Sequence, residues 1–297
     1  MIKNKINLPP SDNIEIEYYV RDSEPDPDRQ LYYPVHVHDY IEFYYLIDGD
    51  VSFMVDNTTY PLKPGDAVFC RPNEIHHCIR HSERPHLNAC FWFMSGNDFL
   101  LAPFLRDRGA GGNLLSPSSD ETRAAIRDLV MKLGRTGEKD TLLEFSQLSQ
   151  LLDIWKGCLS PDTVSGELPE QLKLILDDIS KNLPEIRSIS YLTDKYYLSP
   201  SPLRRLFATH LGTTPKAYIE GKRLARSRIL LKSGARVTEA CMASGFPDLS
   251  NYIRLFRTNF GITPSEYRKG IISTEPNKYK GRHPGPGRRA GGKSFEP

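Results

Sequence analysis

The first hundred residues alternate short apolar runs with turn-forming residues. Runs rich in β-branched and aromatic residues occupy positions 15–20, 41–47, 51–55, 67–70 and 88–93. Glycine, proline, asparagine and aspartate separate them, as in Lys63-Pro64-Gly65-Asp66. Short strands at spacings near ten residues, divided by such turns, are typical of antiparallel sandwiches and barrels. The pattern therefore predicts an antiparallel β-sandwich or β-barrel over residues 1–115.

The apolar spacing changes to a helical period after Ser116. Asp120–Leu133 and Thr141–Trp155 are the two expected helices. One stripe of the second helix consists of Leu142, Phe145, Leu148, Leu152 and Trp155. Because this stripe is longer than packing on a small barrel requires, we expect residues 116–160 to be a helical dimerisation segment. Residues 161–170 are polar, contain glycine and proline, and predict a linker.

Residues 171–272 have a helical pattern and contain an internal repeat. Arg205–Tyr218 (RLFATHLGTTPKAY) and Arg254–Tyr267 (RLFRTNFGITPSEY) are offset by 49 residues, and 8 of their 14 positions are identical. Each copy has one apolar stripe, a glycine suited to a helix C-cap, and a Thr-Pro pair that begins the next helix. A short helix and a tight turn precede each copy. The repeat thus predicts two helix-turn-helix motifs joined by a helix at 216–232, followed by a disordered basic tail at 273–297.

The net charge of +2 conceals an uneven distribution. Residues 1–166 carry 16 Lys+Arg and 25 Asp+Glu, a balance of −9, whereas residues 167–297 carry 23 and 12, a balance of +11. A basic half of this size indicates contact with a polyanion, although charge alone does not choose between DNA, RNA and a membrane.

Other compositional features favour a cytoplasmic protein. No run approaches the roughly 20 apolar residues of a membrane-spanning helix, and the N-terminal residues lack the apolar core of a signal peptide. The five cysteines form no CxxC pair. This spacing argues against a disulfide scaffold and against a structural zinc finger.

The outer face of the second helix in each motif carries side chains suited to DNA. These are Ser201, Arg204 and Arg205 in the first copy, and Ser250, Asn251, Arg254 and Arg257 in the second. Arginine pairs with guanine through two hydrogen bonds and asparagine pairs with adenine; Arg257 is our first candidate for a phosphate contact. A solvated helix face is the alternative. The same arginine at the same register in two copies of a basic domain favours DNA recognition.

This domain resembles the DNA-binding domain of AraC/XylS-family transcription regulators. The second copy carries the matching residues Gly245-Phe246, Ser250, Tyr252, Arg254, Leu255-Phe256, Phe260-Gly261, Thr263-Pro264 and Tyr267-Arg268. Ala240-Cys241, Ser227 and Pro202 depart from the usual pattern. The resemblance implies a sequence-specific transcription regulator, an activator, whose partners are double-stranded DNA, RNA polymerase, a small-molecule effector and a second copy of the chain.

The β domain resembles cupin barrels over residues 30–95. His36-Val37-His38 followed by Glu42 and Gly49 fits the motif H-x-H-x₃-E-x₆-G, and residues 65–76 resemble the second cupin motif with Glu74 in place of its usual glycine. His36 and His38 share one side of a strand, because side chains alternate with period two. With Glu42 and with His76 or His77 they make a three-nitrogen, one-carboxylate set of the kind that binds iron, manganese or zinc.

Three interpretations of these polar residues stay open, ranked as an effector pocket, a structural remnant and a metal site. The first gives an effector site made by His36, His38, Glu42, Tyr44, His76 and Trp92, with the aromatic residues as walls. No metal, cofactor or catalytic residue is then expected. His77, His81 and His86 are expected in loops or at the rim.

The sequence as a whole predicts an α+β protein with a cupin-like antiparallel barrel and an all-helical, double helix-turn-helix domain. We expect a regulator that responds to a carbohydrate, the effector class being implied by resemblance alone. Two alternatives remain. One is a metal-dependent cupin enzyme, an isomerase or dioxygenase, fused to a DNA-targeting domain. The other is a regulator whose barrel serves only to dimerise.

Overall fold

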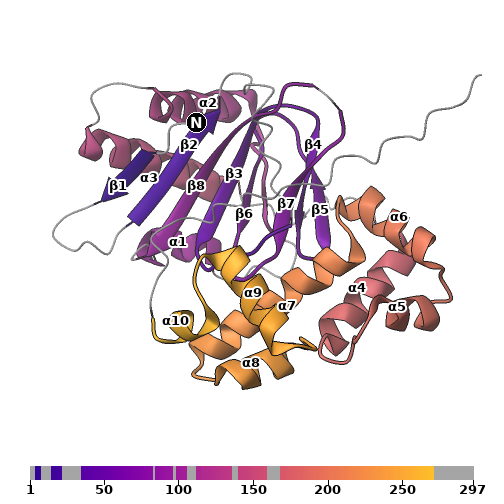
Figure 1. Cartoon of the computed structure of the whole chain (residues 1–297). Helices are drawn as coiled ribbons and strands as arrows, with labels where there is room; N and C mark the ends of the chain where they lie inside the picture. The colour runs from indigo at the N-terminus through magenta and orange to yellow at the C-terminus, as the bar shows by residue number, and fades with distance from the viewer. Residues whose placement is uncertain are drawn as a thin grey trace, which may run out of the picture.

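The computed structural model describes residues 4–7, 15–21, 35–82, 84–95, 98–105, 112–135, 140–158 and 168–270. They form an antiparallel β domain flanked by helices, and an all-helical domain across the ends of the strands (Figure 1). The predicted fold class is confirmed. The expected tail at 273–297 and most of the expected linker at 161–170 lie outside the described residues.

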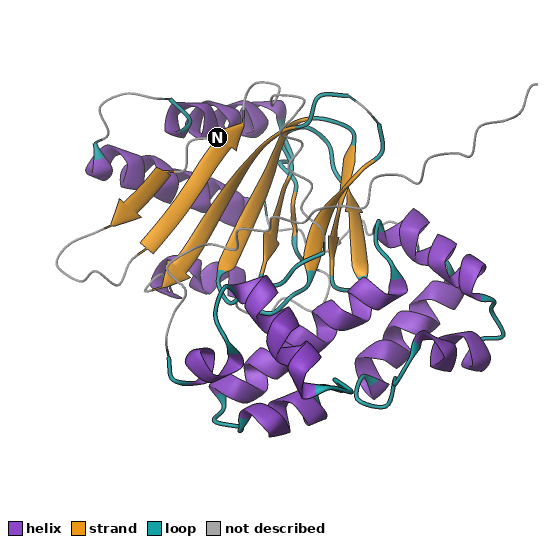
Figure 2. Ribbon diagram, viewed as in Figure 1, coloured by secondary structure: helices purple, strands orange, loops and turns teal. Residues whose placement is uncertain are grey.

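Two antiparallel sheets make up the β domain (Figure 2). The larger has the strand order β1 (Asn4–Asn7), β2 (Glu15–Arg21), β8 (Leu87–Ser95), β3 (Ile41–Asp48), β6 (Ala67–Cys70), β9 (Leu114–Leu115). The smaller has the order β5 (Thr58–Pro61), β4 (Val51–Val55), β7 (His76–Arg80). Among the described strands the two sheets do not join into one closed ring, so the predicted barrel is an open one.

Strand β3 is buried on both faces because a different layer covers each of them. Phe43 and Tyr45 point toward helices on the outside of the large sheet, whereas Tyr44 and Leu46 point toward the small sheet. Alternation with period two separates the two sets. The strand therefore appears in the sequence as a continuous apolar run.

The helices α1 (Asp98–Leu105), α2 (Asp120–Leu133) and α3 (Thr141–Gly157) cover the outer face of the large sheet. Trp155 of α3 stacks on Phe43 of β3, with ring centroids 5.1 Å apart. Trp155, Leu152 and Leu148 are 0%, 5% and 1% exposed. The prediction that this stripe forms a dimer interface is therefore wrong for these three residues, which pack inside their own chain.

The helical domain contains α4 (Glu170–Asn182), α5 (Ile189–Lys195), α6 (Pro200–Leu211), α7 (Pro215–Lys232), α8 (Val237–Ala243), α9 (Leu249–Phe260) and α10 (Pro264–Arg268). Helices α5 and α6 form the first helix-turn-helix motif, and α8 and α9 form the second. Gly212 and Gly261 end α6 and α9 in the left-handed conformation, with φ of 59° and 75°. The expected glycine C-caps are thus confirmed.

One apolar core extends across the boundary between the two domains. Val35, Ile75 and Ile79 of the β domain belong to the same buried cluster as the core of α4–α9. Gly221 of α7 lies against Ile75 and Val35, where a Cβ atom on Gly221 would be 3.3 Å from Ile75 Cγ2. The helical domain is therefore packed tightly against the β domain.

No helix in the described parts of the chain is both long enough and apolar enough to cross a membrane.

Candidate effector site and DNA-binding surface

Four polar residues gather where the strands of the β domain meet the helical domain. His36, His38, Glu42 and His76 each place one side-chain nitrogen or oxygen within 4.8 Å of those of the others. Backbone hydrogen bonds in both directions between His36 and His76, 3.1 and 3.0 Å long, hold these two segments together. The two segments that the cupin-like motifs singled out therefore meet in space.

Backbone carbonyls fix the orientation of two imidazole rings. Nδ1 of His38 lies 3.0 Å from the carbonyl oxygen of Tyr40, and Nδ1 of His76 lies 2.9 Å from that of Glu74. A carbonyl oxygen only accepts hydrogen bonds, so each Nδ1 must carry a hydrogen and donate it. The Nε2 atoms consequently point at Glu42, and they lie 3.1 and 3.7 Å from its Oε2.

Glu42 is the charged centre of this cluster. The residue is 5% exposed, and Trp92 Nε1 donates a hydrogen bond of 2.7 Å to its Oε2. Burial opposes ionisation, but the imidazole rings of His38 and His76 that face the carboxylate hold the pKa of Glu42 well below its usual range. Glu42 is therefore a carboxylate, held in place by strand β3 and by the indole N–H.

The two histidines beside Glu42 differ in their affinity for a proton. Burial, with a further contribution from the charge of His76, lowers the pKa of His38 to about 4. Burial also acts against protonation of His76, but its proximity to the Glu42 carboxylate outweighs this and raises the pKa of His76. At neutral pH His38 is therefore neutral, and of these two rings only His76 can carry a positive charge beside the carboxylate.

The two aromatic residues of the predicted pocket, Trp92 and Tyr44, lie in different surroundings. Trp92 joins the cluster through Glu42. Tyr44, two residues further along β3, packs on Phe53 at a centroid distance of 4.5 Å, and its hydroxyl hydrogen-bonds to His86. Tyr44 therefore belongs to the interior between the sheets.

One expectation about the outer histidines is wrong. His77 was expected in a loop or at the rim, but it lies in strand β7, is 1% exposed, and donates from Nε2 to the carbonyl oxygen of Leu211 over 2.8 Å. Leu211 is the last residue of α6. His77 is thus a contact between the β domain and the first helix-turn-helix motif. His81 is exposed, as expected, and bonds to Ser52.

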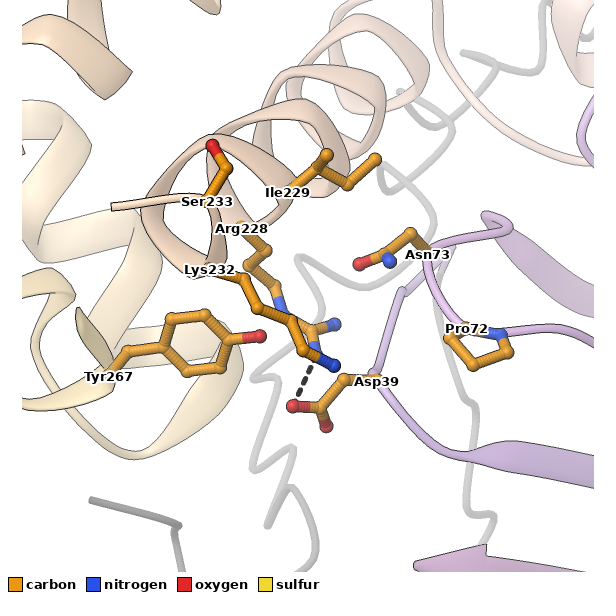
Figure 3. Close-up of a pocket in the computed structure, with 8 residues that line it drawn as sticks. All are labelled: Asp39, Pro72, Asn73, Arg228, Ile229, Lys232, Ser233 and Tyr267. Carbon is orange, nitrogen blue, oxygen red and sulfur yellow. Dashed lines mark ion pairs between the residues drawn. The ribbon is translucent and has the colours of Figure 1, made fainter. Parts of the chain in front are cut away.

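The sequence interpretation missed a second contact between the domains. Arg228 of α7 is buried at 1% exposure, and its Nη2 lies 2.7 Å from Oδ2 of Asp39, the residue after His38. The pair borders a cleft of about 390 Å³ between α7, α10 and two loops of the β domain (Figure 3). On α7, Lys222 makes a similar ion pair with Asp56, also 2.7 Å long. No local pattern could reveal these pairs, because their members lie more than 160 residues apart.

The candidate DNA-binding side chains lie on the outer faces of α6 and α9. Six of the seven are exposed and Asn251 is partly exposed; the exposed residues are Ser201, Arg204, Arg205, Ser250, Arg254 and Arg257. The opposite faces of these helices are buried, with Phe207 and Phe256 at 0% exposure. Arg254 Nη2 donates to Asn251 Oδ1 over 2.7 Å, so Asn251 orients the arginine common to both repeats.

Two protein families match this chain, one in each half. A family described as an AraC-like ligand binding domain matches residues 23–152, and one described as a helix-turn-helix domain matches residues 192–270. Together they cover more than half of the chain.

Curated relatives match across both domains. The transcriptional activator RhaS of Escherichia fergusonii is 25% identical over 250 residues, which cover 80% of this chain and 88% of the relative. RhaS of Salmonella heidelberg is 27% identical over 259 residues, covering 81% and 89%. The transcriptional regulator YbfI of Bacillus subtilis is 24% identical and covers 74% and 81%.

Solved structures similar to this chain include ToxT from Vibrio cholerae. It is 12% identical, covers 89% of this chain and all of its own, and superposes with a TM-score of 0.35. The curated relatives named here are transcription regulators, so the alternative of a metal-dependent enzyme is set aside. With both halves matched and two helix-turn-helix motifs in place, the chain belongs to the AraC family of transcriptional regulators and joins an AraC-like ligand-binding domain to a DNA-binding domain.

Proposed function

We propose that this regulator reads DNA with helices α6 and α9 and that an effector in the polar cluster changes how the helical domain docks on the β domain. The DNA-binding part of this proposal is supported by one observation: two helix-turn-helix motifs have exposed, basic helix faces at equivalent positions. The observation that carries the effector half is the buried cluster around Glu42, which adjoins both contacts to the helical domain.

The two motifs suit binding to one face of the double helix. Two recognition helices on a single rigid domain enter successive segments of the major groove, about one turn or roughly 10 bp apart. Arg205 and Arg254 then contact bases, Asn251 positions Arg254, and Arg257 contacts phosphate. Because the named RhaS relatives are activators, we further propose that this protein activates transcription by contacting RNA polymerase, as a homodimer on DNA.

A carbohydrate is the effector class that resemblance suggests. Its hydroxyl groups would hydrogen-bond to the imidazoles and the carboxylate, and the indole of Trp92 would pack on the sugar ring. His38 and Glu42 are each 5% exposed, and Trp92 is 8% exposed. A sugar would therefore have to open the site, by displacing the strands or the helical domain that covers it.

Selection of genomic fragments by the full chain tests the DNA-binding proposal. The fragments it retains should contain two short conserved blocks about 10 bp apart. Arg205→Ala and Arg254→Ala should each lose the preference at one block. Arg84→Ala, an exposed arginine of the β domain, is the matched control and should select the same fragments as the unchanged chain. If both recognition-helix variants selected the unchanged blocks, the proposed DNA contacts would be wrong.

A further inference from the structure

We propose that the cleft between α7, α10 and two loops of the β domain binds a small carboxylic acid that carries a hydroxyl group, and that this acid fastens the two domains together. The cleft is bordered by residues other than the four of the cluster around Glu42. The acid therefore does not compete with the carbohydrate of the proposed function, and its site does not depend on that proposal.

The cleft is large enough for a small molecule, and both domains build it. Its volume of about 390 Å³ lies within the roughly 300–1,000 Å³ of ligand pockets. The C-terminal part of α7 and Tyr267 of α10 form one wall, and the loops that carry Asp39 and Asn73 form the other (Figure 3). The backbone N–H of Asn73 donates to the carbonyl oxygen of His38 over 2.8 Å, which ties these two loops together. The wall from the β domain is therefore a single, firmly held unit.

A buried guanidinium on the helical side of the cleft has donors without acceptors. Arg228 is 1% exposed, and its Nη2 is paired with Asp39. Its Nε and Nη1 atoms have no hydrogen-bond partner among the described residues. Burial lowers the pKa of Arg228, so holding its positive charge in this position costs free energy. A carboxylate is the acceptor that best meets this need, because hydrogen bonds between two charged groups are the strong ones.

The charges that border the cleft also favour an anion. Arg228 and Lys232 each carry a positive charge and Asp39 carries a negative one, so the lining has one positive charge in excess. Lys232 is exposed at the end of α7, and its side chain runs along the cleft beside Arg228 (Figure 3). One carboxylate makes this lining neutral, whereas a cation would be repelled by it. The charge balance thus selects a ligand with a single negative charge.

An acceptor on the opposite wall requires a donor from the ligand. Oδ1 of Asn73 is buried and has no hydrogen-bond partner in the part of the chain that the structure describes. Asn73 has a φ of 70°, in the left-handed region that asparagine adopts more readily than most residues. Its amide faces Arg228 across the cleft (Figure 3). A buried acceptor without a partner destabilises the folded chain, and a ligand hydroxyl that donates to Oδ1 removes this penalty.

Apolar side chains complete the lining for the carbon skeleton of the acid. Ile229 is 53% exposed although it is hydrophobic, and Pro72 lies on the facing loop. Tyr267 borders the same space and directs its hydroxyl group into it (Figure 3). A few polar groups at fixed places on an otherwise apolar lining are typical of sites for small organic molecules.

An acid held in this way bridges the two domains. Its carboxylate contacts Arg228 and Lys232 of the helical domain, and its hydroxyl group contacts Asn73 of the β domain. A ligand that binds only the docked arrangement stabilises that arrangement by mass action. Because α7 connects the two helix-turn-helix motifs, the acid fixes the position of both motifs relative to the β domain.

Isothermal titration calorimetry of the full chain with two hydroxy acids, gluconate and para-hydroxybenzoate, tests the site at constant ionic strength. A sugar acid and an aromatic acid share the required groups, and the two arms distinguish these sources. We expect one molecule of at least one acid to bind per chain. Its neutral amide should bind at least tenfold more weakly. Hexanoate and benzoate, which lack the hydroxyl group, should bind at least fivefold more weakly than gluconate and para-hydroxybenzoate respectively.

Substitutions in the lining should change the affinity for the acid in opposite directions. Lys232→Gln should lower it fivefold or more, and Asn73→Asp should lower it further because the new carboxylate repels that of the ligand. Asp39→Asn should raise it, because the acid then meets two uncompensated positive charges. Lys216→Gln is the matched control, since Lys216 is an exposed lysine at the opposite end of α7; it should bind the acid normally. Circular dichroism checks that each variant is folded.

Asn73→Gly tests the contact to the hydroxyl group. Glycine keeps the left-handed backbone and removes only the amide, so this variant should bind an acid with and without its hydroxyl group equally well. Two results would overturn the site: no saturable binding of either hydroxy acid by the unchanged chain, or unchanged affinity in the folded Lys232→Gln and Asn73→Asp variants. A preference for the hydroxy acid that persisted in Asn73→Gly would overturn the role of Asn73.

Thermal melting with two probes tests the bridge between the domains. The two tryptophans, Trp92 and Trp155, lie in the β domain, so their fluorescence reports the unfolding of that domain. Circular dichroism of the helices reports the helical domain as well. A saturating acid should raise both transition temperatures together, and a rise in only one of them would overturn the bridge. None of these measurements uses DNA, so the acid site and the proposed DNA binding fail separately.

Discussion

Asp39 and Arg228 form an ion pair across the boundary between the two domains, with 2.7 Å between Oδ2 and Nη2. The carboxylate side is 45% exposed and the guanidinium side 1% exposed. The guanidinium also lies over the rings of Phe260 and Tyr267, at 4.7 and 5.3 Å from their centroids. The β domain thus supplies the counter-charge for a buried arginine of the DNA-binding domain.

Asp39→Asn should therefore destabilise the docked arrangement of the domains. Loss of the carboxylate leaves the buried Arg228 charge uncompensated, and removing one partner of a fully buried pair costs about 3–5 kcal/mol. Because Asp39 is partly exposed and screened by solvent, we expect a smaller loss of about 1–2 kcal/mol. Urea unfolding measures it. Asp50→Asn, in an exposed turn, should change the free energy of unfolding by less than about 0.5 kcal/mol; an equal loss in both variants would contradict the prediction.

Gly212→Ala should lower the free energy of unfolding by more than backbone strain alone does, because the added methyl group pushes against the β domain. Gly212 has φ of +59°, and a Cβ atom there would lie 2.8 Å from Ile79 Cγ1 and 3.0 Å from His77. Gly234, with φ of +98° and open space around it, is the matched control for backbone strain alone. Left-handed strain costs roughly 1 kcal/mol in either variant. A larger decrease in the free energy of unfolding in Gly212→Ala than in Gly234→Ala therefore measures how closely the β domain approaches Gly212. Equal losses would show that the β domain does not press on this turn.

Removal of Arg254 and removal of Arg257 should have different effects on the base preference and on the salt dependence of DNA binding. Arg254→Ala should cost about 1–3 kcal/mol at one base pair and relax the preference there, and Asn251→Ala should repeat part of this effect because Asn251 orients Arg254. Arg257→Ala should weaken all sequences alike and reduce the salt slope by about 1. Fluorescence anisotropy on substituted duplexes at several salt concentrations separates these effects. A loss of base preference in Arg257→Ala would reverse the assignment.

The homodimer remains a prediction, and the structure changes where its interface should be sought. Leu142 and Leu143, at the start of α3, are 74% and 55% exposed, whereas Leu148 is buried in the core. We expect Leu142→Glu to convert a dimer into a folded monomer in sedimentation velocity, and Leu148→Glu to unfold the β domain. Leu174→Glu, at a 53% exposed site on α4, should leave the dimer intact. A dimeric Leu142→Glu protein would place the interface elsewhere.

Acid should lower the stability of the DNA-binding domain, because it protonates Asp178. Its carboxylate accepts hydrogen bonds of 2.7 Å from Lys195 of α5 and from Asn182. Burial opposes ionisation, but these bonds prevail and lower the pKa of Asp178. The carboxylate of Asp178 therefore takes up a proton at a higher pH in the unfolded state than in the folded state. The stabilisation is complete above about pH 4–5 and is lost as the pH falls through the folded-state pKa.

Asp178→Asn tests this pH dependence. It should lower the free energy of unfolding by about 1 kcal/mol at pH 7 and by less at pH 3. Asp177→Asn is the control, because Asp177 forms an exposed ion pair with Lys181 on the same helix. A deficit in Asp178→Asn that stayed constant between pH 7 and pH 3 would exclude the carboxylate as its cause.

Features set by neighbouring residues could be predicted from the sequence. The period-two runs, the helical stripes and the caps at Gly212 and Gly261 depend on contacts within a few positions of the chain. The repeat at a 49-residue offset identified both helix-turn-helix motifs, because each motif is built from such local contacts. The His-x-His-x₃-Glu spacing likewise placed three polar residues on one wall of the β domain.

Features that depend on which surfaces meet were decided only by the tertiary structure. A helical stripe shows that Leu148 and Trp155 are buried, but not whether a second chain or their own sheet buries them. His77 was expected in a loop or at the rim, and no pattern singled out Asp39, yet packing places the two residues against α6 and α7. The sequence by itself determined the two domains and their recognition helices through short-range periodicity. Asp39, Asp56 and His77 contact residues of the helical domain that are more than 130 positions away, and only the folded chain brings them together.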